Sequence, residues 1–472
     1  MLEFDLLVIG TGPAGQRAAV QASKLGHSVA VVERREAVGG VCLNTGTVPS
    51  KTLREAVLYL TGHQQRGMYG DSHRVKQNIT AQDLHRRTDC VVQREMQVIR
   101  SQMQRNGIAV LTGTATFVDP HTLVVRGEGE PLRVSAERIV IAVGTRPAVP
   151  DSIPTDGEVI LDTDQVLRLR DIPRTLTVVG GGVIGTEYAS MFAVLGTRVT
   201  LVDKRPRLME FLDSEIVDDL VFQLRDMGVV FRLGEDVSSI EMDGDGRAVA
   251  RLGSGKVITS QALLYSAGRA GATEDLNLDA AGLEADGRGR IKVDGQFRTA
   301  VAHIYAAGDV IGFPSLASTS AEQGRLAACH ALGIASGMVP VLFPYGIYSI
   351  PEISFVGRSE DELTRDGVPY EVGVARYREI ARGQILGDEN GLVKLLFHRE
   401  SRALLGAHAI GTGATELIHI AQAVMAFGGG LEFFLANVFN YPTLAECYKV
   451  AALDCMNKLG VAPGSVALPR AA

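Results

Sequence analysis

The chain has 472 residues, 53 of them glycine, and its formal net charge is −7 at pH 7. With 46% hydrophobic and 21% charged residues, the composition excludes a disordered or fibrous protein, and the length predicts roughly three domains. The acidic balance excludes a broad nucleic-acid interface, which needs clustered lysines and arginines. Because the glycine surplus has no collagen period, we expect many tight turns and close backbone approaches.

The first predicted unit is a strand, a glycine-rich turn and a helix. The apolar run at residues 6–9 indicates a buried parallel strand, and an alanine-rich stretch follows the turn. Gly10 permits the tight turn, Gly12 lets the backbone approach a pyrophosphate, and Gly15 lets the helix pack on the strand. Glu33 ends the next predicted strand, where an acid accepts hydrogen bonds from ribose hydroxyls. A plain glycine-rich turn is the alternative, which the strand–turn–helix context disfavours.

A long helix and a further strand are predicted next. The helix covers residues 81–106, where Leu84 and Ile99 keep to one face and charged residues cover the other. Gly107 is a typical residue to end it. The apolar run at 139–143 indicates another buried parallel strand.

A second strand–turn–helix unit repeats the first. A strand predicted at 176–179 leads into Gly180, Gly182 and Gly185, and Asp203 ends the strand that follows. Two complete units imply two dinucleotides. Asp203 suits the free 2′-hydroxyl of NAD, because it would repel a 2′-phosphate.

Three basic residues follow that acid closely. Lys204 and Arg205 come directly after Asp203, and Arg207 is nearby. Cations at this place can pair with a 2′-phosphate. A solvated loop is an equally good interpretation of these charges, and the sequence leaves both open.

After Asp203 the sequence predicts short alternating strands joined by turns. The turns lie at residues 242–246, 253–255 and 286–289. The first has some features of a calcium loop but lacks its final glutamate, so we expect no metal site. From about residue 340, strands at 353–356 and 393–397 and a helix at 414–426 come without a nucleotide fingerprint, which favours a third domain devoted to assembly.

The five cysteines are scattered and include no CxxC pair, which excludes a zinc ribbon and a disulfide framework. The longest apolar region, at 331–356, is interrupted by three prolines, and the first residues carry no basic signal region. We therefore expect a soluble cytoplasmic protein that binds neither membrane nor nucleic acid.

The segment from Gly39 to Lys51, GGVCLNTGTVPSK, resembles the active-site stretch of the flavoprotein disulfide reductases. The resemblance extends to residues 142–147, 306–309 and 441–446. It implies an α/β fold with two Rossmann-like (βαβ) dinucleotide-binding domains and a C-terminal α+β dimerisation domain. The implied limits are 1–149 and 270–340 for the FAD-binding domain, 150–269 for the NAD(P)-binding domain and 341–472 for the dimerisation domain.

The resemblance also implies the residues of the site and a homodimer or larger homo-oligomer. Those for FAD are Gly10, Gly12, Gly15, Glu33, Arg34, Gly40, Cys42, Lys51, Thr145, Asp309 and Ala317. Those for NAD(P) are Gly180, Gly182, Gly185, Glu187, Asp203, Lys204, Arg205 and Gly268. Lys51 would lie beside the reactive flavin nitrogen with Glu187 as its ion-pair partner, and Asp309 would bind the ribitol chain.

Two departures from this family decide the predicted chemistry. Cys42 keeps the first position of the redox pair, but Thr47 occupies the second, and a hydroxyl cannot form a disulfide. Tyr441 stands where the family has a histidine base, although Glu446 is retained. We therefore expect no dithiol relay, and a packed, inert Cys42.

In these two departures the sequence resembles the soluble pyridine nucleotide transhydrogenases, a branch of the family. The similarity includes residues 346–352 and 439–443. It implies the reversible transfer NADPH + NAD+ ⇌ NADP+ + NADH through FAD, and Asp203 beside Lys204 and Arg205 fits a pocket that admits both nucleotides. Because one fingerprint remains after FAD takes the first, we expect ping-pong kinetics. The alternatives are an NAD(P)H:quinone or diaphorase-type reductase and a non-catalytic flavin-bound assembly protein.

Overall fold

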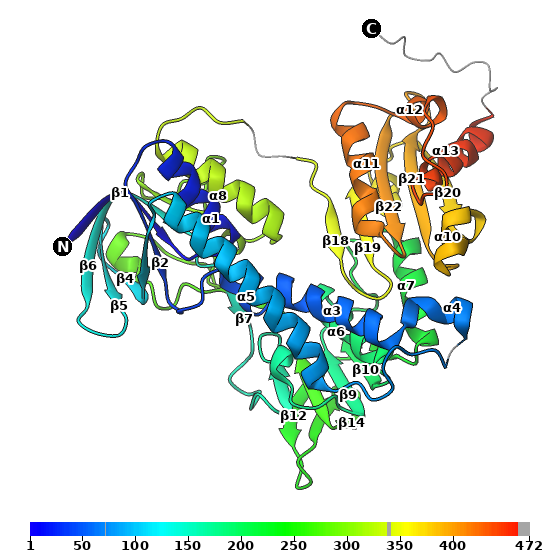
Figure 1. Cartoon of the computed structure of the whole chain (residues 1–472), viewed down its shortest axis with the longest axis horizontal. Coiled ribbons are helices and arrows are strands. Elements are labelled where there is room, and N and C mark those ends of the chain that lie inside the picture. The colour runs from blue at the N-terminus through cyan, green and yellow to red at the C-terminus, as the bar shows by residue number, and fades with distance from the viewer. Residues whose placement is uncertain (71, 338–340, 461–472) are drawn as a thin grey trace.

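The computed structural model describes residues 1–70, 72–337 and 341–460. In this part of the chain, helices pack against sheets of seven, five and five strands, which form a first, a second and a C-terminal unit. Figure 1 shows the first and the C-terminal unit side by side, with the second unit below them. Two long helices, α3 (Thr47–Thr61) and α5 (Ala81–Arg105), run between the units.

The first sheet has the order β3-β2-β1-β6-β5-β4, with β17 paired to β6. Its strands are β1 (Leu2–Ile9), β2 (Val29–Glu33), β3 (Ala109–Thr112), β4 (Thr114–Asp119), β5 (Thr122–Arg126), β6 (Leu132–Ile141) and β17 (Ile304–Ala306). Its other helices are α1 (Pro13–Lys24), α2 (Gly40–Asn44) and α8 (Ala317–Ala331). The short helix α4 (Arg66–Tyr69) lies instead by the C-terminal unit, where a Cβ at Gly67 would be 3.0 Å from the carbonyl oxygen of Gly387. Strands β1, β2, β3, β6 and β17 are parallel, and every residue of β2 is buried, as in sheets covered on both faces.

The helices of this unit follow their sequence signals. The predicted helix at 81–106 is confirmed as α5, which begins with a capping box of Thr80 and Asp83 and is followed by Gly107 at φ +62°. Helices α1 and α8 pack backbone to backbone, because a Cβ at Gly324 would collide with the carbonyl oxygen of Ala14.

The second unit is inserted between β6 and β17. Its parallel sheet has the order β11-β10-β9-β15-β8, and an antiparallel ribbon β12-β13-β14 lies beside it. The strands are β8 (Ile160–Asp162), β9 (Thr175–Val179), β10 (Arg198–Asp203), β11 (Val230–Leu233), β12 (Val237–Met242), β13 (Ala248–Leu252), β14 (Val257–Ser260) and β15 (Ala262–Tyr265). Two antiparallel strands, β7 (Thr145–Pro147) and β16 (Arg269–Gly271), carry the chain out of the first unit and back.

The structure corrects two details of the expected second and first units. The region after Asp203 is not strands alone, because α7 (Ser214–Asp226) follows β10, with the Asp213 side chain as its N-cap. Its buried residues Ile216, Leu220 and Leu224 recur at helical spacing, a period that the neighbouring turn signals obscured. The strand expected at 139–143 begins earlier and ends at Ile141, because β6 also pairs antiparallel with β5.

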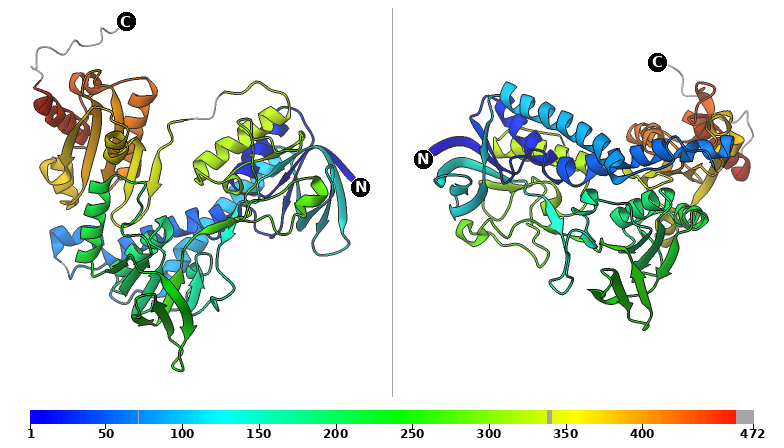
Figure 2. Two further views of the ribbon diagram at one scale, coloured as in Figure 1. Left: turned by 180° about the vertical axis from the view of Figure 1, so that it is seen from behind. Right: turned by 60° about the horizontal axis from the view of Figure 1, so that its bottom comes forward.

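The C-terminal unit is an antiparallel sheet, β18-β19-β22-β21-β20, packed with helices (Figure 2). Its strands are β18 (Tyr345–Ile347), β19 (Ile353–Gly357), β20 (Tyr370–Arg376), β21 (Leu392–His398) and β22 (Leu404–Ile410). Its helices are α9 (Glu360–Arg365), α10 (Ala381–Leu386), α11 (Ala414–Ala426), α12 (Leu431–Ala436) and α13 (Glu446–Leu459). The strands expected at 353–356 and 393–397 and the helix at 414–426 are confirmed.

A buried charge cluster joins the C-terminal and second units. Lys394 on β21 is fully buried, and its ammonium lies 2.9 Å from Asp213 and 3.0 Å from Glu215 and also pairs with Glu360. The three carboxylates converge as metal ligands do, but the ammonium already supplies the positive charge between them. No helix among the described residues is long and apolar enough to cross a membrane.

Candidate functional site

The first glycine-rich turn requires its glycines for steric reasons. Gly10 has φ +104°, and a Cβ there would collide with the carbonyl oxygen of Ala142 on the neighbouring strand end. A Cβ at Gly15 would collide with the carbonyl oxygen of Gly10, so helix α1 packs directly on the turn. A Cβ at Gly12 would meet nothing within 4 Å, which leaves the backbone open to a ligand.

The second turn repeats this geometry. Gly180 has φ +108°, and a Cβ there would lie 2.8 Å from the carbonyl oxygen of Ser266. A Cβ at Gly185 would collide with the carbonyl oxygen of Gly180, whereas one at Gly182 would meet nothing within 4 Å. The two units therefore present the same opening at the same place.

The acid that ends the following strand is bound to its own turn in both units. In the first unit, Glu33 accepts hydrogen bonds from the backbone N–H of Thr11 at 3.2 Å and from the Thr11 hydroxyl. In the second, Asp203 accepts from the N–H of Gly181 at 2.6 Å. Both carboxylates are buried, so each is fixed beside the turn before any ligand binds.

Two connected cavities open at these turns. The larger has a volume of about 1470 Å³ and reaches from the second turn to the region between the units. The predicted FAD residues that line the smaller cavity are Gly10, Gly12, Glu33, Arg34, Gly40, Cys42, Thr145, Asp309 and Ala317. The predicted NAD(P) residues that line the larger are Gly180, Gly182, Glu187, Asp203, Lys204, Arg205 and Gly268. Gly15 and Gly185 line neither, because they pack beneath their turns.

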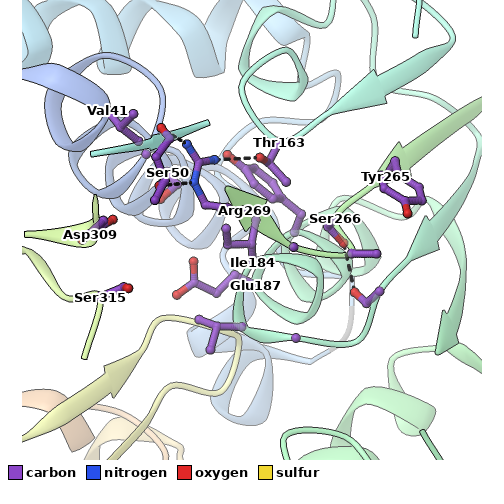
Figure 3. A pocket seen from close by; sticks show the side chains of 18 of the residues that line it. Val41, Ser50, Thr163, Ile184, Glu187, Tyr265, Ser266, Arg269, Asp309 and Ser315 are labelled. Atoms are coloured by element: carbon purple, nitrogen blue, oxygen red, sulfur yellow. Dashed lines mark hydrogen bonds between the residues drawn. The ribbon is translucent and has the colours of Figure 1, made fainter. Parts of the chain in front are cut away.

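Lys51 lies in the larger cavity, where the two cavities meet. Thr47, Thr145, Asp309 and Ala317 line both cavities, and Lys51 lines the larger beside them. Figure 3 shows Glu187 and Asp309 facing this shared space from different elements.

An ion pair joins two helices at this junction. The Nζ of Lys51 on α3 lies 2.8 and 2.9 Å from the two carboxylate oxygens of Glu187 on α6 (Val183–Val194). Glu187 is only 3% exposed and also accepts a hydrogen bond from the backbone N–H of Tyr348 at 2.8 Å. The Tyr348 ring lies under the ammonium, 5.0 Å from Nζ to the ring centroid. The ammonium is therefore held in place at the junction.

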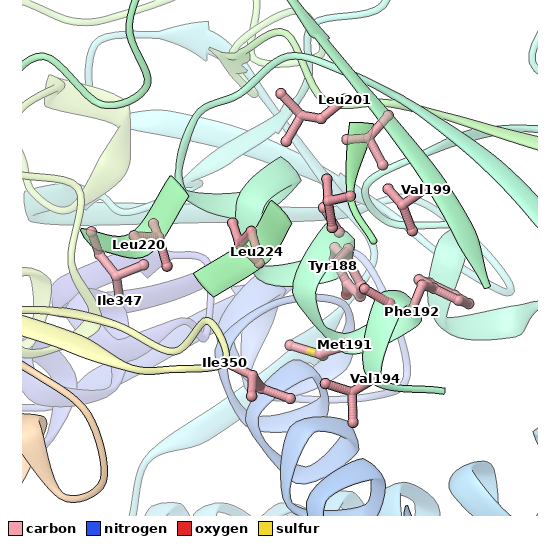
Figure 4. Packing of buried hydrophobic residues seen from close by; sticks show 14 of the residues in the cluster. Tyr188, Met191, Phe192, Val194, Val199, Leu201, Leu220, Leu224, Ile347 and Ile350 are labelled. Atoms are coloured by element: carbon pink, nitrogen blue, oxygen red, sulfur yellow. The ribbon is translucent and has the colours of Figure 1, made fainter. Parts of the chain in front are cut away.

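Helix α6, which carries Glu187, is buried on nearly all sides. Figure 4 shows its Tyr188 and Phe192 packed among residues of β10 and α7, and Ile350 of the C-terminal unit beside Met191 of the same helix. The hydroxyl of Ser190 accepts a hydrogen bond from the N–H of Ile350 at 3.0 Å. This packing fixes the position of the carboxylate relative to α3.

Asp309 is a buried acid in the first unit. Burial raises the pKa of its carboxyl, although the Ser320 hydroxyl, 3.1 Å from one oxygen, partly offsets this. The carboxylate therefore gains from a hydroxyl-bearing ligand that would supply further hydrogen bonds.

Sequence reasoning missed Arg269, which joins the two units. From β16, its guanidinium donates to the Thr145 hydroxyl at 2.9 Å and the Thr145 carbonyl at 3.0 Å, both on β7. It also donates to Thr163 of the second unit at 3.1 Å (Figure 3) and to Asp164 at 3.1 Å. Its contacts lie more than a hundred residues away in the chain, so only its position next to Gly268 pointed to it.

The cysteines form no disulfide among the residues that the structure describes. All five cysteines are free thiols. Burial raises the pKa of the Cys42 thiol, which disfavours the reactive thiolate, and a hydrogen bond with Thr47 offsets this only in part. At the other end of the chain, Tyr441 is 74% exposed on the C-terminal unit.

The family model described as pyridine nucleotide-disulphide oxidoreductase matches residues 4–324. The chain belongs to this family. The model of the family's dimerisation domain matches residues 343–452, which indicates a homo-oligomer.

Curated relatives cover almost the whole chain. A protein named soluble pyridine nucleotide transhydrogenase from Mycobacterium tuberculosis (strain ATCC 25177 / H37Ra) is 55% identical over 97% of this chain and 98% of its own. A protein of the same name from Colwellia psychrerythraea is 43% identical over 97% of this chain and 99% of its own.

Solved structures share the fold along the chain. LpdA from Mycobacterium tuberculosis has a TM-score of 0.88 at 25% identity, over 96% of this chain and 99% of its own. The HOCl-induced flavoprotein disulfide reductase RclA from Escherichia coli, as a Cu(II) complex, has a TM-score of 0.87 at 27% identity, over 96% and 99% of the two chains.

Proposed function

We propose that the protein is an FAD-dependent soluble pyridine nucleotide transhydrogenase that catalyses NADPH + NAD+ ⇌ NADP+ + NADH by a ping-pong mechanism. The observation that carries the proposal is Thr47 opposite Cys42, beside two intact dinucleotide turns. Without a second thiol, electrons cannot pass through a disulfide of the protein, so the acceptor has to be a second nicotinamide nucleotide, a quinone or dye, or oxygen. The names of the relatives at 55% and 43% identity favour the same activity.

We propose that FAD binds at the first turn and the smaller cavity. The cradle fits a pyrophosphate because Gly12 is open and the adjacent Gly40, at φ +59°, has no side chain to fill the gap. When bound, FAD supplies the group that accepts and returns the hydride. Glu33 would hold the ribose and Asp309 the ribitol chain. The remaining contacts would come from Gly10, Gly15, Arg34, Cys42, Lys51, Thr145 and Ala317.

We propose that NAD(H) and NADP(H) bind in turn at the second turn and the larger cavity. Gly182 leaves room for the pyrophosphate, and Asp203, Lys204 and Arg205 lie where the adenosine ribose would be. Gly180, Gly185, Glu187 and Gly268 complete the proposed set. Because the chain has only this one further fingerprint, the first product has to leave before the second nucleotide enters.

In this proposal, Lys51 acts by charge and position. Glu187 and the Tyr348 ring hold its ammonium at the junction of the cavities, so no reorganisation is needed when negative charge develops there. Arg269 keeps the two units, and so the two binding sites, at a fixed spacing through β7 and β16.

We propose the domain limits 1–149 and 270–340 for FAD, 150–269 for NAD(P) and 341–472 for dimerisation. The return of the chain to the first sheet at β17 supports the split first domain. Two large apolar side chains of the C-terminal unit, Phe427 and Val438, are each 92% exposed, which favours their burial in a homodimer. The five free thiols favour a reducing compartment, and we propose the cytoplasm.

Anaerobic stopped-flow spectroscopy tests the function. NADPH should bleach the flavin absorbance of the purified protein, and a second mix with NAD+ should restore it at a rate consistent with turnover. Steady-state rates with both nucleotides should give parallel double-reciprocal lines. Intersecting lines would contradict the ping-pong mechanism. Quinone turnover far above nucleotide turnover would overturn the proposal in favour of a quinone reductase.

A further inference from the structure

The carboxylate at the end of β10 is chelated by an arginine two residues later. The Arg205 guanidinium donates from Nε to Oδ1 of Asp203 at 2.9 Å and from Nη2 to Oδ2 at 2.7 Å. The backbone N–H of Arg205 donates to Oδ1 at 2.8 Å, and that of Gly181 donates to Oδ2 at 2.6 Å. Asp203 thus accepts four hydrogen bonds, two on each oxygen.

These four bonds use the whole acceptor capacity of the carboxylate. An ionised carboxylate offers about four lone-pair sites. With Arg205 in this position, Asp203 has no acceptor left for a ribose hydroxyl. An incoming NAD therefore has to displace the guanidinium before Asp203 can bind its adenosine ribose.

The equivalent acid of the first unit differs in this respect. Glu33 accepts from the N–H and the hydroxyl of Thr11 and from the N–H of Arg35 at 3.2 Å. Arg35 corresponds in position to Arg205, but among the described contacts its side chain donates nothing to Glu33. Glu33 therefore keeps an acceptor site for a hydroxyl, and the chelation is particular to the second unit.

The two partners of the pair differ in freedom to move. The Asp203 side chain is 5% exposed, whereas that of Arg205 is 37% exposed, and both line the larger cavity. Burial opposes the ionisation of Asp203, but the hydrogen bonds from Arg205 and Gly181 outweigh it and lower the pKa of the carboxyl. The carboxylate stays charged and fixed, and the guanidinium is the partner that can leave.

We propose that Arg205 is a specificity-determining residue that competes with NAD and captures NADP, a role that rests on the proposed function. Its guanidinium leaves Asp203 when the ribose hydroxyls of NAD bind to the carboxylate. When NADP binds, the guanidinium pairs with the 2′-phosphate, for which its planar fork is suited. One side chain thus lets a single pocket admit both nucleotides.

The two members of the pair should have opposite effects on selectivity. Arg205→Ala removes the phosphate partner and the competitor of the ribose, so it should weaken binding of a 2′-phosphorylated ligand about 10- to 100-fold without weakening the unphosphorylated one. Asp203→Asn removes the negative charge and replaces one acceptor oxygen with an NH2 donor, so it should weaken the unphosphorylated ligand about tenfold and tighten the phosphorylated one.

Calorimetric titration of the full-length holoenzyme with ADP-ribose and 2′-phospho-ADP-ribose tests this. Neither probe carries a nicotinamide, so the result does not depend on hydride transfer. Arg207→Ala is the matched control: it removes the same charge from the same loop, but its guanidinium pairs with Asp218 at 3.2 Å. It should leave the ratio of the two dissociation constants within about twofold.

Three outcomes would overturn the proposed role of Arg205 as a specificity-determining residue. One is an equal loss of affinity for both probes in Arg205→Ala. Another is a change in the ratio of the two dissociation constants in Arg207→Ala as large as in Arg205→Ala. The third is loss of phosphate preference in Lys204→Ala but not in Arg205→Ala. In each case the stopped-flow transfer from NADPH to NAD+ would still be measured independently, so failure of this role and failure of the function remain distinguishable.

Discussion

Lys51 and Glu187 show how two ordinary helix residues acquire a role through their surroundings. Lysine and glutamate usually lie on the protein surface. Here, however, Glu187 is 3% exposed, and the Lys51 ammonium lies 2.8 Å from its carboxylate and over an aromatic ring. A buried carboxylate without this partner would be costly, so the pair also stabilises the contact of α3 with α6.

Lys51→Met should slow reduction of the flavin by NADPH about 100-fold, because a preorganised charge is lost where negative charge develops. The KM for NADPH should change by less than about threefold, since the proposed contacts to the pyrophosphate and the adenosine ribose come from Gly182, Asp203 and Arg205 and not from Lys51. Stopped-flow rates measure the first effect and steady-state kinetics the second. Lys51→Arg should recover part of the rate, and an unchanged reduction rate in Lys51→Met would show that the charge has no such role.

At the scale of elements, α3 links the junction to the C-terminal unit. Arg54, one turn after Lys51, pairs with Glu352 at 3.1 Å and donates to the carbonyl oxygen of Ser349 at 3.0 Å. The helix ends at Thr61, Gly62 follows at φ +61°, and the chain then turns His63 inward. The contacts along α3 therefore connect the position of Lys51 with the packing at the far end of the helix.

His63 should make the stability of this end pH-dependent. Burial, with a smaller effect of Arg66, lowers the pKa of His63 to about 4, below its ordinary 6.5. Between these values the unfolded chain binds more protons, so the stabilisation is full above about pH 6.5 and is lost as the pH falls toward 4. Thermal unfolding followed by circular dichroism should show a smaller loss of Tm on acidification in His63→Gln than in the parent protein. The exposed His419→Gln is the control and should follow the parent.

The elements also show what the sequence could predict. The two glycine turns and helix α5 were predictable because the steric need for glycine and the helical period are local signals. Helix α7 was obscured by the turn signals around it, although its apolar spacing is regular. The pairing of Arg205 with Asp203 depends on side-chain geometry, which no local pattern encodes. The hydrogen bonds of Arg269 depend on contacts between residues far apart in the chain.

At the scale of the molecule, ion pairs of Lys394 connect the C-terminal unit to the second unit. The partners of Lys394 are Asp213, the N-cap of α7, Glu215 in the first turn of α7, and Glu360 at the start of α9. Burial opposes the charge of Lys394, but the hydrogen bonds that its ammonium donates to Glu360 and Asp213 outweigh this effect and raise the pKa of the ammonium. The interface therefore depends on charge balance as well as on apolar packing.

Lys394→Met should destabilise the protein by about 3–5 kcal/mol, because it leaves the buried Asp213 without a counter-charge. The double variant Lys394→Met with Asp213→Asn should recover part of the loss. Differential scanning calorimetry would measure both as shifts of Tm. Equal Tm values for the single and double variants would show that the pair is not coupled.

The insertion of the second unit also sets an order of events during synthesis. Strand β6 is complete at Ile141, but its neighbour β17 begins only at Ile304, whereas the second sheet lies wholly between them from Ile160 to Tyr265. As the chain leaves the ribosome, the second sheet can close while the last residues of β6, Ile139–Ile141, still lack their partner β17. The amino-terminal sheet, although translated first, is therefore finished last of the two, and its exposed edge is the one that a nascent-chain chaperone would have to protect.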